Sequence, residues 1–132
     1  MQLWVSVRHQ SCVVVVDLNT YQVVKVLRPP VLAAKVGAAD AACPGGIAFS
    51  GGMAFVPSFF GDAVVIYDAQ QKNWLKTLPL KQAHNGQSVR MNEPFAAVEY
   101  AGKIYISSHT SGNNTVPRIT SGVDLEDVGV QL

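Results

Sequence analysis

The chain has three histidines, His9, His84 and His109, and these side chains are the best suited to metal chemistry. Neutral imidazole is the commonest protein ligand for many transition metals. The three are far apart in the chain, and none belongs to an H-x-H or H-E-x-x-H spacing that holds two ligands to one ion. They are metal candidates only if the fold brings them together, and we predict no bound cofactor.

Two local groupings of residues suggest nucleophilic chemistry. Ser107 and Ser108 precede His109, and Cys12 closely follows His9. Neighbours on one strand or loop rarely adopt the geometry of a catalytic triad, and no G-x-S-x-G elbow is present. We therefore predict no catalytic residue and favour a non-catalytic role, with enzyme activity left open.

Composition excludes several classes of protein. With 132 residues, 48% hydrophobic and 14% charged, the chain is long enough for one domain with a core. The net charge is +1 and the basic residues are scattered singly, which argues against nucleic-acid binding. The longest strictly apolar run, Cys12 to Val16, falls far short of the ~18 residues of a transmembrane helix. No signal peptide is visible, and composition leaves the localisation unknown.

The two cysteines leave two interpretations open. Cys12 and Cys43 would form a disulfide in an oxidising compartment, or they are ordinary core thiols. We favour the core thiols.

The elements that must position any site come from a stretch that occurs twice. Residues 3–27 and 54–78 align without a gap when they are set 51 residues apart. The aligned pairs include Trp4 and Phe55, Val5 and Val56, Val14 and Val65, Asp17 and Asp68, and Lys25 and Lys76. Such internal similarity predicts two copies of one structural unit.

Each copy has the pattern of short strands joined by turns. Runs of β-branched residues favour strands over helices. The predicted strands are Leu3–Val7, Cys12–Val16, Val23–Leu27, Gly46–Ser50, Met53–Val56, Ala63–Tyr67 and Trp74–Leu78. Gly51-Gly52 suits a tight hairpin, and Asp17 and Asp68 are expected to accept backbone N–H bonds in the turns that follow them.

The pattern begins a third time, 50 residues after the second copy. Phe95–Tyr100 and Lys103–Ser107 are predicted to form a hairpin through Ala101-Gly102. We expect a connector over residues 79–93, with a turn at Asn85-Gly86, and a polar loop over residues 109–114.

A period of about 50 residues with four antiparallel strands is typical of a β-propeller blade. The stretch from Trp4 to Leu27, WVSVRHQSCVVVVDLNTYQVVKVL, resembles the YVTN or surface-layer type of propeller repeat. Val14–Asp17 and Val65–Asp68 fill that repeat's V-I-D position. The resemblance covers residues 3–28 and 45–80 and part of 95–110, and this chain departs from it in its longer connectors. It implies a propeller fold, recognition of a protein or cell surface, and an extracytoplasmic location.

We therefore expect a single all-β repeat domain over residues 1–132, with blade-like units at about 3–28, 45–80 and 95–132. A closed propeller needs at least ~4 blades, so we expect an incomplete ring. The chain is then a segment of a larger propeller, or it closes a ring with other copies or partner chains. A small β-sandwich is the alternative fold. Both propeller interpretations require a protein partner or a homo-oligomer.

Strand direction predicts where binding residues gather. If the four strands of a unit are called A to D, the B–C loops and D–A connectors emerge at one end, which we call the loop face. The candidate binding residues there are Arg8, His9, Asp62, His84, Arg90, Asn92 and His109. The predicted function is a binding or assembly scaffold that recognises a protein or surface partner through the loop face. The alternative is an enzyme or metal-binding propeller segment with a site lined by His9, His84 and His109.

Overall fold

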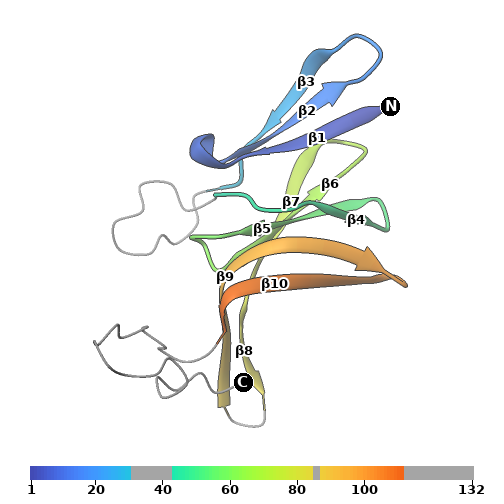
Figure 1. Cartoon of the computed structure of the whole chain (residues 1–132). Coiled ribbons are helices and arrows are strands. Elements are labelled where there is room, and N and C mark those ends of the chain that lie inside the picture. Colours follow the sequence, from blue (N-terminus) through green and yellow to red (C-terminus); the bar gives the residue numbers. More distant parts are fainter. Residues whose placement is uncertain (31–42, 85–86, 112–132) are drawn as a thin grey trace, which may run out of the picture.

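The computed structural model describes the backbone of residues 1–30, 43–84 and 87–111, and the side chains of residues 1–30, 43–80 and 93–109. These residues form strands, turns and one short 3-10 helix, η1 (Arg8–Gln10), so the prediction of an all-β chain is confirmed. The strands lie in three antiparallel sheets, stacked from top to bottom in Figure 1. The described strands do not close into a barrel or a ring.

The first sheet contains β1 (Gln2–Val7), β2 (Cys12–Asp17) and β3 (Gln22–Leu27), paired in that order. Its valine runs suit a pleated sheet because their branched side chains pack well there. The pairing of β2 with β3 contains a β-bulge between Val15 and Val16.

The second sheet contains β4 (Ala48–Ser50), β5 (Met53–Ser58), β6 (Ala63–Asp68) and β7 (Asn73–Pro79), again paired in chain order. Gly51 and Gly52 join β4 to β5 with φ values of 56° and 76°. Two consecutive residues with positive φ form the tight hairpin that the Gly-Gly pair predicted.

The third sheet is built on one long strand. β9 (Gln87–Tyr100) pairs at its start with β8 (Lys81–His84) and along most of its length with β10 (Lys103–Ser111). Glu93 has a φ of 52°, and the register of β9 with β10 shifts between Ile106 and Ser108. The hairpin of β8 and the start of β9 projects away from the sheet stack in Figure 1.

Two predictions about connecting segments were wrong. Most of the predicted connector over residues 79–93 is strand, in β8 and the first part of β9, and the predicted polar loop from His109 begins with three residues of β10. These segments are held in strands by backbone hydrogen bonds, as in the pairing of Thr110 with Asn92. Such bonds form without an alternating apolar pattern in the side chains, which is the pattern from which strands were predicted. The predicted turn at Asn85-Gly86 and the part of the third unit after residue 111 lie outside the described residues.

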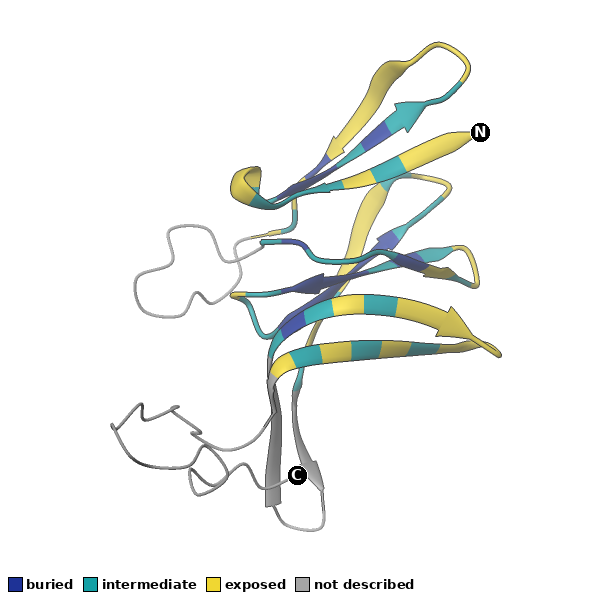
Figure 2. Ribbon diagram, in the orientation of Figure 1, coloured by how far each residue is buried: buried dark blue, intermediate teal, exposed yellow. Residues whose placement is uncertain are grey.

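The core lies between the first and second sheets (Figure 2). Its buried members are Val13, Val15, Leu27, Ala54, Val56, Val65 and Tyr67, with Trp4 and Ile47 packed against them. The ring of Trp4 meets Phe49 edge-on at a centroid distance of 5.4 Å and Tyr67 at 6.5 Å. Each fully buried apolar side chain of this size contributes roughly 1.5–3 kcal/mol, so this contact holds the two sheets together.

Turns and loops separate to opposite ends of the stack, as the strand directions predicted. The turns after β2, β4, β6 and β9 point right in Figure 1, whereas η1 and the link from β5 to β6 lie at the left. The left end is the loop face.

Candidate functional site

The loop face brings together some of the predicted binding residues. Arg8 and His9 lie in η1, Asp62 lies between β5 and β6, and His109 lies near the end of β10. Arg8 and Asp62 are half-buried, and His9 and His109 are exposed. The backbone of His84, Arg90 and Asn92 lies in β8 and β9, but their side chains are outside the described residues.

Arg8 is held between two phenyl rings. Its guanidinium carbon lies 5.0 Å from the centroid of Phe95 and 5.4 Å from that of Phe59. Both distances are within the range of a cation–π interaction. Nη2 also points at the Cys43 sulfur, 3.6 Å away. Sulfur is a weak acceptor, so the charge of Arg8 is stabilised mainly by the rings.

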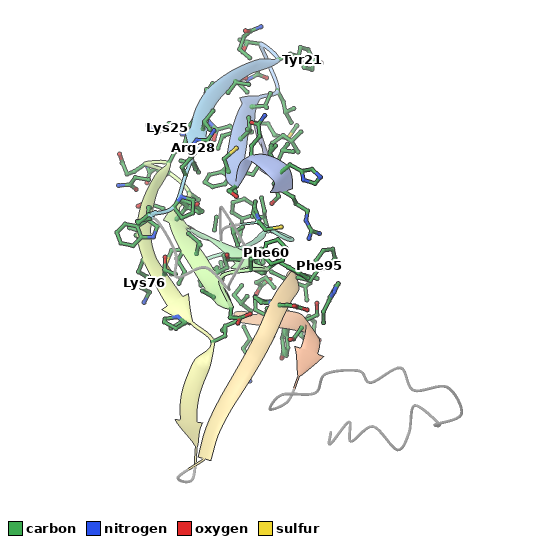
Figure 3. All side chains as sticks on the ribbon, turned by 90° about the vertical axis from the view of Figure 1, so that its left-hand side faces the viewer. Tyr21, Lys25, Arg28, Phe60, Lys76 and Phe95 are labelled. Carbon is green, nitrogen blue, oxygen red and sulfur yellow. The ribbon has the colours of Figure 1, made fainter. Side chains whose placement is uncertain are left out.

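His109 packs on the same two rings. Its centroid lies 4.9 Å from Phe95 and 5.2 Å from Phe59, with the second contact edge-on at 89°. Phe60 continues the surface, 5.1 Å from Phe59. We call Arg8, Cys43, Phe59, Phe95 and His109 the arginine–aromatic cluster. Figure 3, which looks onto this end of the molecule, labels Phe95 of the cluster and the neighbouring Phe60.

Backbone contacts place the members of the cluster. The N–H of Phe59 donates to the carbonyl of Cys43 at 3.2 Å, and the N–H of Gly46 donates to the carbonyl of Phe95 at 2.7 Å. A Cβ on Gly45 would lie 2.9 Å from the Phe95 carbonyl carbon, so only glycine permits this approach. The segment around Gly45 therefore joins the second sheet to the third and sets the position of Phe95.

Asp62 has a structural role in this arrangement. Its Oδ1 accepts the backbone N–H of Glu93 at 2.8 Å, and its carbonyl accepts the N–H of Leu80 at 3.0 Å. Both Asp62 and Glu93 have positive φ. The carboxylate therefore fixes the backbone of β9 at Glu93, in the middle of the strand and two residues before Phe95 of the cluster.

Asp17 and Asp68 have the capping role that the sequence predicted. Asp17 Oδ1 accepts the N–H groups of Asn19 at 2.7 Å and Thr20 at 3.3 Å. Asp68 Oδ1 accepts those of Gln70 at 2.8 Å and Gln71 at 2.7 Å. Both turns lie at the opposite end from the loop face, so these carboxylates do not contribute to the site.

A small cavity of about 10 Å³ lies between the first and second sheets, lined in part by Cys12, Pro44, Val56 and Tyr67. This volume holds about one water molecule. Burial raises the pKa of Tyr67 well above its ordinary value, and the neighbouring Cys12 thiol adds to the shift. The phenol is therefore neutral at physiological pH, and the cavity is too small for a substrate.

The described side chains form no group of three His, Cys, Asp or Glu that could hold a metal ion. Cys12 is buried and Cys43 half-buried, and both are free thiols. No helix in the described part of the chain is long and apolar enough to cross a membrane.

Three members of the cluster were not predicted. Phe59 lies between the predicted strands Met53–Val56 and Ala63–Tyr67, and the adjacent aromatic pair Phe59-Phe60 was an available signal. Phe95 was predicted to lie in a strand and Cys43 to be a core thiol, so no local pattern linked them to Arg8.

No protein-family model matches the chain, and a search of curated proteins finds no match.

Proposed function

We propose that the protein is a non-catalytic binding scaffold, built of propeller-type blades, that recognises a protein partner through the loop face. The arginine–aromatic cluster carries this proposal, because it places a cation and several aromatic rings at one accessible end of a rigid stack. Arginine and aromatic residues are enriched in the energetically important parts of protein interfaces.

Equivalent local geometry in the first two sheets supports a blade-like unit. Ser11 and Asp62, 51 residues apart, have φ values of 51° and 46°, and Tyr21 and Lys72, also 51 apart, have values of 56° and 55°. The β-bulge between Val15 and Val16 recurs at the equivalent place, between Ile66 and Tyr67. The first two sheets thus share positive-φ residues and a β-bulge at equivalent positions, as repeated blades would.

The chemistry of Arg8 indicates what the partner offers. No described carboxylate pairs with this guanidinium, whose contacts are the two rings and the Cys43 sulfur. The guanidinium carries five N–H donors along the edge of its plane, and among the described residues only the Cys43 sulfur accepts from them. A carboxylate is the acceptor that matches this donor edge in charge and geometry. The partner should therefore present a carboxylate, from an acidic side chain or from the C-terminus of a chain.

A peptide library displayed on phage tests the proposal. We expect panning against the immobilised protein to enrich acidic sequences whose synthetic peptides bind the wild-type chain. Arg8→Gln should weaken binding ~10-fold or more, because a hydrogen bond to a charged group contributes about 1.5–3 kcal/mol. Lys25→Gln is the matched control, since Lys25 lies on β3 away from the cluster (Figure 3).

Circular dichroism would establish that both variants remain folded. If panning enriches no sequence, or if the enriched peptides bind Arg8→Gln as tightly as the wild type, recognition by the arginine–aromatic cluster is wrong.

A further inference from the structure

The two sides of the first sheet differ in what covers them. Trp4, Val13 and Val15 point towards the second sheet and belong to the core. Strand alternation and register place Leu3, Val5, Val7, Cys12, Val14, Val16, Val23 and Val26 on the other side, where Cys12, at the end next to η1, is 1% exposed. We call that side the open upper face. It is entirely apolar, yet Leu3 is 48% exposed, Val5 39% and Val26 47%.

The second sheet shows what covers such a face. Ala54, Val56, Val65 and Tyr67 lie 51 residues after Leu3, Val5, Val14 and Val16 and form the upper face of the second sheet. The first sheet packs on this face, so that Ala54 is 0% exposed and Val56, Val65 and Tyr67 are each 2% exposed. The same positions are therefore buried where a sheet covers them, whereas in the first sheet, which no described strand covers on this side, Leu3 and Val5 are exposed and Val14 and Val16 are half-buried.

The third sheet has the complementary uncovered side. Exposure alternates along β10 in Figure 2, with Ile104 and Ile106 half-buried and Tyr105 50% exposed. Tyr105 pairs with Val98, which is 59% exposed. We call the side with Val98 and Tyr105 the open lower face.

Trp4 and Phe55 are the equivalents of Tyr105 in the first and second sheets. Trp4 lies on the lower side of its sheet, where its ring meets Phe49 and Tyr67 of the second sheet. Ala48, 50 residues before Val98, is only 5% exposed in the second sheet. The lower side of each preceding sheet is therefore covered by the sheet that follows it.

We propose that the open lower face of one copy of this chain docks on the open upper face of a second copy, in the orientation in which successive sheets pack within the chain. In this contact Tyr105 takes the place of Trp4 and lies against Leu3 and Val16 of the other copy. The occupant is a second copy because the chain itself contains both halves of the contact. This interface uses the sheet faces and does not depend on recognition at the loop face.

The contact is head-to-tail, since the two faces are different surfaces of the chain. Such contacts close into a ring if the rotation between copies permits, and otherwise extend into a filament. A tyrosine suits the contact because its ring is apolar while its hydroxyl reaches solvent at the rim.

Light scattering over a range of concentrations tests the contact. We expect the wild-type chain to form assemblies of at least about twice the 14.1 kDa of one chain. Val5→Lys places a charge on the open upper face and Tyr105→Glu places one on the open lower face. Each should raise the concentration needed for assembly ~100-fold or more, because an unpaired charge would be buried. Leu75→Lys is the matched control, since Leu75 is 42% exposed on β7 and lies on neither open face.

A mixture of the two variants makes the test specific. A Val5→Lys chain retains its lower face and a Tyr105→Glu chain retains its upper face, so together they rebuild one natural contact. We expect the mixture to assemble at concentrations where neither variant does so alone. A wild-type monomer at every concentration, or assemblies that these substitutions weaken no more than Leu75→Lys does, would overturn the proposal. Either result would leave the loop-face proposal to its own peptide test.

Discussion

Replacing Gly45 by alanine should loosen the third sheet from the second and displace Phe95. The added Cβ would overlap the Phe95 carbonyl oxygen and lie 2.9 Å from its carbonyl carbon and 3.3 Å from its Cα. All three are backbone atoms, so no rotamer change relieves the overlap. The two segments must move apart, which stretches the 2.7 Å hydrogen bond from Gly46 to Phe95 and strains the 2.9 Å bond from Gly45 to Pro57.

The expected loss of stability follows from these contacts. Two hydrogen bonds contribute about 0.5–1.5 kcal/mol each, and an overpacked contact typically adds about 1–3 kcal/mol. We therefore expect Gly45→Ala to lower the free energy of unfolding by ~2–6 kcal/mol. Gly46→Ala should cost less, because its Cβ would lie 3.0 Å from the Ala97 nitrogen.

Gly52→Ala is the control for backbone strain alone. Gly52 has a φ of 76° and no atom within 4 Å of the position of a Cβ, so the cost should be ~1 kcal/mol. Urea unfolding measures all three variants, and hydrogen exchange in β9 and β10 reports the loosening of the third sheet. If Gly45→Ala is no less stable than Gly52→Ala, the close approach of Gly45 to Phe95 is wrong.

Three further predictions concern the turns and the core. Asp68→Ala should lower the free energy of unfolding, measured in urea, by ~1–2 kcal/mol. Asp17→Ala should lower it by less, because one of the two hydrogen bonds to Asp17 is 3.3 Å long. Equal losses for the two variants would contradict this ranking. Burial raises the pKa of Tyr67 above 10.0 in the folded chain, so the unfolded chain loses the phenol proton at a lower pH than the folded chain does. The neutral Tyr67 side chain therefore makes its full contribution to the free energy of unfolding below pH ~10. Above that pH the free energy of unfolding should fall by up to ~1.4 kcal/mol per pH unit because of Tyr67. Urea unfolding between pH 8 and 11 should show a shallower decline of this free energy for Tyr67→Phe than for the wild type. Trp4→Ala should lower the free energy of unfolding by ~2–4 kcal/mol. Trp74→Ala should lower it by under ~1 kcal/mol because Trp74 is 43% exposed. Thermal melts in which Trp74→Ala is the less stable variant would contradict the position of Trp4 between the sheets.

Local patterns in the sequence were sufficient for most strands and turns of the first two sheets. Valine-rich runs such as Cys12–Val16 prefer extended backbone whatever surrounds them. Asp17 and Asp68 bond to N–H groups two and three residues ahead, so their turns need no distant partner. The polar residues of β8 and the start of β9 were misassigned because their pairing leaves no period-2 apolar signal.

The candidate site was only partly predictable. Strand direction correctly placed Arg8, Asp62 and His109 at one end, because antiparallel strands send alternate loops to the same end. It did not predict that Phe59 and Phe95 would enclose Arg8. Those contacts join three sheets, and they depend on the distance and angle at which the sheets stack.

The sequence by itself determined the alternation that gives each strand two sides, and it placed closely similar apolar residues at Val5 and Val56. Only the tertiary structure decided which of those sides is covered: Val56 is 2% exposed and Val5 is 39% exposed. The physical reason is that hydrophobic burial is non-directional and depends on what lies opposite a side chain. What lies opposite Val56 is another sheet of the same chain, contributed by residues far away in the sequence.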